Sequence, residues 1–348
     1  MQIQPTNIVQ FIFVFQMIFG IFLIWNNARY RGLCYLIIFA MTSMLFNLFE
    51  ELAGSKELYL ITPVFLLAKG PLFYLFAYQL VYPDKQVTKQ RLMHLCPMLL
   101  ALPFTQWPQW VIGLGTVSQL IYIYISIKLI FSYHKASFSM RSDADSLQLF
   151  WLAKVLVAFL VVGLLDLVRL NLQPYISFEL NLAGQLFENS IILLLFSFLI
   201  YKAVQHPRLF NGMSAFERLA KQTPDIETLE NDEITTTIFA SLEQVIKEKS
   251  LHHKSRLSLN DLATETGLNT REISRAINQC AQRSFCDYIN KLRVDDLKGK
   301  LLQTKAKKIS ILDAAFDVGF NSKSSFNSIF KRETGSTPTQ FMKNISNE

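Results

Sequence analysis

Long apolar runs fill most of the first 205 residues of the chain. Seven can be drawn, each near the ~20 residues that a helix needs to cross a bilayer. They cover residues 8–25, 32–49, 58–82, 92–106, 110–133, 147–170 and 178–204, and the fourth is the shortest. The pattern predicts an all-α fold in which residues 1–204 form a seven-span transmembrane helical bundle.

Positive charges fall in alternate gaps between these runs. The gaps after the first, third and fifth runs contain Arg29, Arg31, Lys85, Lys89, Arg91, Lys135 and Arg141. The other gaps contain a single Lys56, with Arg169 just before the last of them. Because cytoplasmic loops carry the excess of Lys and Arg, we expect a multi-pass protein of the bacterial inner membrane. Its N-terminus would lie outside and its C-terminal part in the cytoplasm, which needs an odd number of spans.

A few ionisable residues interrupt the apolar runs. Lys69 and Glu188 should lie near mid-depth, and Asp166 and Arg169 are three residues apart on one helix face. A charge in a membrane is costly, so such residues usually face a partner or a cavity. Two interpretations stay open for this group of four. It either ties helices together, or forms a polar pocket that binds a small-molecule or membrane signal.

The composition changes after residue 204. Residues 205–233 mix Pro, Gly, Asn and charged residues, which is typical of a linker. A helical stripe follows, made of Ile234, Ile238, Leu242, Val245 and Ile246. This helix could be the first of the next domain, a rod that carries a signal, or a surface that pairs two chains into a homodimer.

Residues 258–280 have the pattern of a helix-turn-helix. Ser258 is a helix cap, Gly267 a helix end, and Asn269 with Glu272 a capping box for the second helix. The stripe predicted to face inward is Ile273, Ala276, Ile277 and Cys280. The stripe predicted to face outward, at the same spacing, is Arg271, Ser274, Arg275 and Asn278.

Residues 310–335 repeat the arrangement. Ala314, Ala315 and Val318 form an apolar stripe with Ile311, Gly319 ends that helix, and Ser322 caps the next. On this second helix Phe326, Ile329 and Phe330 are predicted to face inward. Its predicted outward face is Ser324, Asn327, Ser328 and Lys331. Between the two units, "SFCDYINKLRVDDLKGKLL" predicts a helix of about 18 residues, ~27 Å long. Such a helix can hold two recognition helices roughly one turn of DNA apart, ~34 Å.

Charge and side-chain chemistry favour a nucleic-acid partner for this part of the chain. From Leu251 onward there are 16 Lys and Arg against 10 Asp and Glu, and a basic domain favours a polyanion. Arg271 and Arg275 can each bind guanine with two hydrogen bonds, and Asn327 can pair with adenine. The side chains better placed for phosphate are Thr270, Asn278, Lys323, Ser325 and Lys331.

Residues 234–345 resemble the DNA-binding domain of the AraC/XylS family of bacterial transcription regulators. The motifs that carry the resemblance are "LSLNDLATETGLNTREISR", "KLRVDDLKGKLL" and "DVGFNSKSSFNSIFKRETGSTPTQF". It implies an AraC-type DNA-binding domain over 234–348, with base-reading positions at Arg271, Ser274, Arg275, Lys323, Ser324, Asn327 and Ser328. Family members commonly carry a soluble, barrel-like sensing domain where this chain has apolar runs, so the resemblance does not extend to residues 1–204.

Together these patterns predict a membrane-tethered, sequence-specific transcriptional regulator. The membrane domain would sense an unknown signal and modulate binding of double-stranded promoter DNA, with the lipid bilayer and RNA polymerase as further partners. The alternative is a transporter or membrane-enzyme domain fused to a regulatory DNA-binding domain. No phosphate loop, HExxH or GxSxG is present, so we expect no enzyme, cofactor or metal site. Cleavage within 205–233, which would free a fragment of ~15 kDa, is a third hypothesis.

Overall fold

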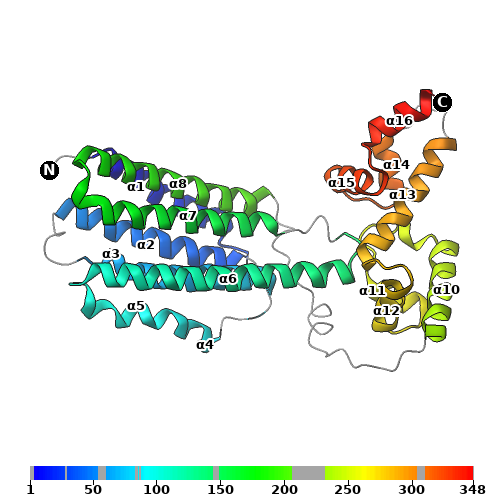
Figure 1. The fold of residues 1–348 in the computed structure, drawn as a ribbon, viewed down its shortest axis with the longest axis horizontal. Coiled ribbons are helices and arrows are strands. Elements are labelled where there is room, and N and C mark those ends of the chain that lie inside the picture. Colours follow the sequence, from blue (N-terminus) through cyan, green and yellow to red (C-terminus); the bar gives the residue numbers. More distant parts are fainter. Residues whose placement is uncertain are drawn as a thin grey trace. The chain divides into compact units, whose positions relative to one another are not determined.

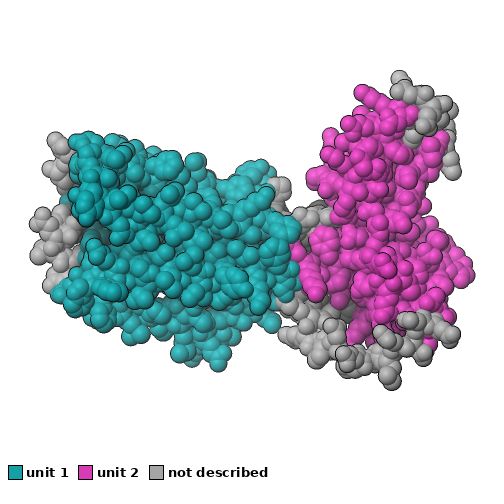
Figure 2. Space-filling view, viewed as in Figure 1, with its two compact units in different colours: residues 1–133, 149–213 teal, residues 134–148, 214–348 magenta. Residues whose placement is uncertain are grey.

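The computed structural model describes residues 4–27, 30–53, 60–82, 85, 88–143, 149–205, 232–303 and 310–347. Every element in these ranges is helical, apart from one isolated bridge between Arg141 and Ser258, which confirms the all-α prediction. The chain divides into two compact units (Figures 1 and 2). The first contains residues 1–133 and 149–213, and the second contains residues 134–148 and 214–348.

Six helices of the described chain are long and apolar enough to cross a membrane. They are α1 (Pro5–Ile24), α2 (Arg31–Ala53), α3 (Thr62–Val81), α6 (Pro108–Met140), α7 (Phe150–Leu172) and α8 (Phe178–Gln205). The apolar window of α3 is 83% buried, whereas those of the other five are 22–33% buried. Helix α3 therefore lies inside the bundle, and the others turn large side chains such as Phe22 and Trp110 outward. An apolar surface of this extent suits lipid better than water.

The seven full spans predicted from the sequence are not confirmed, because the fourth run is broken. Residues 89–104 form four short elements: α4 (Lys89–Leu92), η3 (Met93–Leu95), α5 (Cys96–Leu100) and η4 (Leu102–Phe104). Pro97 and Pro103 each lack a backbone N–H and interrupt helix propagation. The segment still belongs to the bundle. It contacts α3, and the ring of His94 lies 2.7 Å from the hydroxyl of Tyr122 on α6.

The four charged residues predicted inside the membrane helices come together between α3, α7 and α8. Arg169 Nε donates to Asp166 Oδ1 at 2.9 Å, and its Nη2 lies 3.9 Å from Glu188 Oε2. Lys69 is attracted electrostatically by both carboxylates. A hollow of about 300 Å³ lies elsewhere in the bundle, lined by Leu67, Ala101, Phe104, Trp107, Trp110, Val111 and Leu114. None of the four charged residues lines this hollow.

The second unit has two hydrophobic cores that share one helix. Its elements are α10 (Asp232–Glu248), η8 (Leu251–His253), α11 (Leu259–Thr266), α12 (Thr270–Cys280), α13 (Phe285–Gln303), α14 (Ile311–Asp317), α15 (Lys323–Thr334) and α16 (Pro338–Asn347). Helix α13 gives Phe285 and Ile289 to the first core, and Val294 and Leu297 to the second. It has 19 residues, close to the predicted 18. Helix α10 packs into the first core, which is the first of the roles predicted for it.

Candidate nucleic-acid interface

The first helix-turn-helix is built from α11 and α12, and local hydrogen bonds fix their ends. Ser258 and Asp261 form a reciprocal capping box at the start of α11. Gly267 ends that helix with φ of +69°, a left-handed conformation that glycine adopts at little cost. The Asn269 side chain accepts from Arg271 N at 3.0 Å, and Glu272 accepts from Asn269 N at 3.0 Å. All three predicted helix signals are confirmed.

The second helix-turn-helix, α14 and α15, has its helix ends fixed in the same way. The Ser322 hydroxyl accepts from Ser325 N at 3.2 Å and so caps α15. Gly319 and Gly335 have φ of +99° and +76°, and they end α14 and α15. Helices α11 and α15 are therefore each started by a side-chain cap and stopped by a left-handed glycine, and this fixes where their outward faces begin and end.

The inward stripes are confirmed with one exception. Ile273, Ala276 and Ile277 are buried in the first helix-turn-helix, and Phe326, Ile329 and Phe330 are buried in the second. Cys280, predicted to face inward, is exposed. It is the last residue of α12, where the stripe passes beyond the core, and its Sγ lies 3.9 Å from the carbonyl of Thr235.

The residues expected to contact DNA lie on the outer faces of α12 and α15. Among the base-reading candidates, Ser274 and Arg275 are half-buried, and the exposed ones are Arg271, Lys323, Ser324, Asn327 and Ser328. Among the phosphate candidates, Asn278 and Lys331 are exposed and Thr270 and Ser325 are half-buried. Arg275 Nε donates to Gln279 Oε1 at 3.2 Å, which lays this guanidinium along the helix.

Ion pairs attach the second recognition helix to the start of α13. Arg332 Nη2 lies 2.6 Å from Asp287 Oδ1, and Arg283 Nη1 lies 2.8 Å from Glu333 Oε2. Arg332 therefore has a structural role, although it is exposed on the same helix as Lys331. These pairs position α15 relative to the helix that also supports the first unit.

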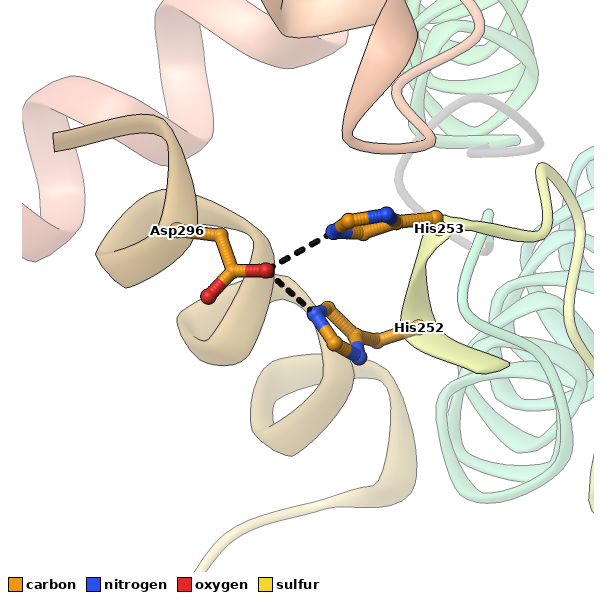
Figure 3. A group of neighbouring side chains, drawn as sticks. All are labelled: His252, His253 and Asp296. Carbon is orange, nitrogen blue, oxygen red and sulfur yellow. Dashed lines mark hydrogen bonds and ion pairs between the residues drawn. The ribbon is translucent and has the colours of Figure 1, made fainter. Parts of the chain in front are cut away.

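A group of two histidines and one carboxylate joins η8 to α13 (Figure 3). Nε2 of His252 and of His253 each lies 2.7 Å from Asp296 Oδ2. Burial raises the pKa of Asp296, but the hydrogen bonds from both rings outweigh it and leave that pKa below its usual value.

Three donors this close raise the question of a metal ion. A ligating histidine normally donates its other ring N–H to an acceptor. Nδ1 of His252 is buried without a partner in the described chain. The group is therefore best described as a carboxylate held by two imidazole N–H groups.

Sequence reasoning missed one buried charge on α13. Arg293 is 2% exposed and donates to the carbonyls of His252 at 2.8 Å and Lys254 at 2.9 Å. A signal was present in the sequence. Position 293 lies midway between Ile289 and Leu297 on the buried face of α13, where an apolar residue is expected.

Comparison with known proteins agrees with this architecture. Residues 262–344 match the family described as "Helix-turn-helix domain". The melibiose operon regulatory protein of Escherichia coli K12 is 30% identical over 92 residues, 26% of this chain and 30% of that regulator. The C-terminal part of the chain is an AraC-type helix-turn-helix domain. The AraC-type domain is also similar to the probable transcription factor PqrA of Proteus vulgaris, with 27% identity over 97 residues, 28% of this chain and 77% of PqrA.

These matches extend over a small part of the molecule. The chain spans about a third of the length of the melibiose operon regulators that it matches. An uncharacterised HTH-type transcriptional regulator of Pseudoalteromonas carrageenovora is 26% identical over 90 residues, half of its own length. No solved structure matches the chain. The family match begins at residue 262, so the apolar helices lie outside it, whereas the AraC-type domain accounts for both helix-turn-helix units.

Proposed function

We propose that this chain is a membrane-tethered, sequence-specific regulator of transcription. Its AraC-type domain binds double-stranded promoter DNA, and its helical bundle lies in the bacterial inner membrane and responds to a signal. One observation carries the proposal. Two capped recognition helices with polar, partly basic outer faces belong to the same chain as six long apolar helices, five of which turn large apolar side chains outward.

The side chains on the outer faces of α12 and α15 divide into those that read bases and those that contact the DNA backbone. Arg271 and Arg275 each form two hydrogen bonds with a guanine. Each such bidentate contact contributes ~1–3 kcal/mol of discrimination against the wrong base. Ser274 extends this surface in the first unit, and the second unit reads with Lys323, Ser324, Asn327 and Ser328. The groups that contact phosphate, and so position the domain without reading sequence, are Thr270, Asn278, Ser325 and Lys331.

The topology follows from charge and from the broken fourth run. Lys85, Lys89 and Arg91 lie on the same side as Lys135 and Arg141 if residues 89–104 cross the bilayer as a series of short helical turns. That crossing supplies the odd count that leaves the N-terminus outside and the AraC-type domain in the cytoplasm. Its contact with α3 supports this assignment.

Signal detection is assigned to the bundle. The cluster of Lys69, Asp166, Arg169 and Glu188 is the proposed polar site for a small-molecule or membrane signal, because ionisable groups are kept inside membranes mainly for function. RNA polymerase and a second copy of the chain are the further partners. The relatives named above are regulators of transcription, and no observation favours a transporter or a membrane enzyme.

The test is selection of DNA by the intact protein. Full-length protein in lipid nanodiscs is presented with a library of random duplexes, and the enriched sequence is measured against bulk DNA. Arg271→Ala should weaken binding to the enriched sequence by about 10–100-fold and to bulk DNA far less. Lys247→Ala is the charge-matched control, because Lys247 is exposed on α10 and pairs with Glu243. Equal losses on both kinds of DNA, or no enriched sequence, would refute the proposal.

A further inference from the structure

Helix α6 begins in one unit and ends in the other. It runs for 33 residues from Pro108 to Met140, about 50 Å at 1.5 Å per residue. That is longer than the ~30 Å hydrocarbon layer. Residues 134–148 belong to the second unit, so the end of α6 and the residues that follow are part of the same compact body as the AraC-type domain.

The end of this segment is held in the AraC-type domain by its backbone. Ser142 N donates to the carbonyl of Leu257 at 2.9 Å, and Arg141 forms an antiparallel bridge with Ser258, the cap of α11. Met140 packs against the core of the first helix-turn-helix. Ser142 and Asp143 are 1% and 6% exposed. The segment therefore fills a site in the domain and does not merely rest on its surface.

The floor of that site is one face of α13. Cys286, Asn290 and Arg293 follow the spacing of a single helix face and are all buried. The Ser142 carbonyl accepts from Asn290 Nδ2 at 3.2 Å and from Cys286 Sγ at 3.5 Å. The Ser142 hydroxyl accepts from Arg293 Nη2 at 3.0 Å. Ser142 thus accepts hydrogen bonds from three side chains of α13.

Arg293 makes the site sensitive to its occupant. Burial lowers the pKa of Arg293 to about 10, and Cys286 and Asp143 act in the opposite direction. The guanidinium therefore stays charged at neutral pH. A buried charge must be hydrogen-bonded, and removal of one partner is strongly unfavourable. If the segment left the site, Arg293 and Asn290 would each lose an acceptor, and α13 would have to adjust around them.

The same site lies at the boundary between the two helix-turn-helix units. Arg293 separates the residues that α13 gives to the first core from those that it gives to the second. Its guanidinium lies 5.9 Å from the centre of the Phe320 ring, in the second core. The His252 carbonyl that it binds also abuts Gly319, where an added Cβ would come within 2.8 Å. A shift at Arg293 would thus alter how the two recognition helices are held relative to one another.

We propose that residues 140–143 are an internal ligand of the AraC-type domain, and that their docking against α13 couples α6 to DNA binding. The inference deepens the proposed function and rests on it for the step from docking to DNA affinity. Two connections then join the units: the chain after Gln205, and the segment docked through Ser142. The docked segment transmits a displacement of α6, because it continues directly from that helix.

The test separates these two connections in the full-length protein. A protease site is inserted within residues 206–231, the protein is placed in membrane vesicles, and the cut C-terminal fragment is partitioned by sedimentation. We expect the wild-type fragment to stay with the vesicles. Ser142→Leu should raise its release by at least about tenfold, because the leucine cannot accept from Arg293 and does not fit the buried position.

The matched control is Ser139→Leu. The Ser139 hydroxyl donates to the carbonyls of Lys135 and Ala136 within α6, so this change should leave retention at the wild-type level. The released fragment has the same sequence in every case, so its folding cannot explain a difference. Immediate release of the wild-type fragment, or equal retention of the Ser142 and Ser139 variants, would overturn the docking proposal.

A second readout tests the coupling. The uncut Ser142→Leu protein should differ from wild type by at least about fivefold in affinity for its selected DNA, whereas the Ser139→Leu protein should not. Equal affinities would overturn the coupling. If the released fragment prefers no sequence, the proposed function fails, and the retention measurement still decides whether the segment docks.

Discussion

Gly319 is the position where one methyl group should do most damage to the AraC-type domain. Its φ is +99°, and an alanine Cβ would lie 2.7 Å from the His253 carbonyl and 2.8 Å from that of His252. The left-handed conformation alone costs an L-residue about 1–2 kcal/mol. Overpacking against atoms that cannot rotate away adds about 1–3 kcal/mol. Gly319→Ala should therefore lower the free energy of unfolding of this region by roughly 2–5 kcal/mol.

Two other glycines separate these contributions. Gly267 also has a positive φ, +69°, but an added Cβ meets nothing within 4 Å, so Gly267→Ala should cost only the conformational part, about 1–2 kcal/mol. Gly299 lies inside α13 with open space around it. Gly299→Ala should stabilise the domain by up to about 1 kcal/mol, because alanine loses less backbone entropy in a helix.

The series can be measured on the intact protein in nanodiscs. Hydrogen exchange followed by mass spectrometry, at rising urea concentration, reports the opening free energy of peptides from α12 and α15. The expected order of stability is Gly299→Ala, wild type, Gly267→Ala and Gly319→Ala. If Gly319→Ala lowered the opening free energy no more than Gly267→Ala, the close approach of η8 to the turn between α14 and α15 would be wrong. The link between the two helix-turn-helix units would then be wrong as well.

Three further predictions concern charge. Lys331→Ala should weaken binding to all DNA sequences alike and reduce the slope of log affinity against log salt by about 1, as expected for one lost phosphate contact in a salt titration. The pKa of Asp296 is raised by burial and lowered more strongly by the hydrogen bonds from His252 and His253. The ionised Asp296 carboxylate therefore stabilises the domain above about pH 4, and this contribution is lost as the pH falls through the lowered pKa. Urea unfolding at about pH 6 and about pH 3 should therefore show a smaller acid loss in Asp296→Asn than in wild type, and an equal loss would contradict the assignment. Arg169→Leu should lower the melting temperature of the bundle, since it removes the guanidinium that pairs with Asp166 and Glu188. Adding Asp166→Leu should restore part of the loss in a thermal-shift assay.

The sequence was most informative where a structure depends on nearby residues. Ser258, Asn269 and Ser322 were predicted as helix caps, and all three are, because a cap is decided by residues two or three positions away. The outward faces of α12 and α15 follow from the same local geometry. Cys280 was placed wrongly because a periodic pattern does not show where the core that supports it ends.

The fourth apolar run does not form one continuous helix. It is apolar enough to cross a bilayer, but Pro97 and Pro103 divide it into short turns, so its composition alone overstated the length of the helix.

Contacts between distant parts of the chain could not be predicted from the sequence. The Ser142 hydroxyl and Arg293 meet across 151 residues of chain. Nothing local in either segment predicts that contact, although a charge on the buried face of α13 was visible in the sequence. Lys69 and Glu188 were predicted to lie near mid-depth; in the structure Glu188 Oε2 lies 3.9 Å from Arg169 Nη2, and Lys69 interacts electrostatically with Glu188.

In the proposed function, one intact chain both spans the membrane and reads DNA. Crosslinking of living cells, isolation of the membrane fraction and sequencing of the DNA bound to the full-length protein tests it directly. We expect discrete promoter sites that disappear in Arg271→Ala and are recovered with the 40.1 kDa chain. Recovery of such sites only with a soluble C-terminal fragment, or no enrichment over bulk DNA, would contradict it.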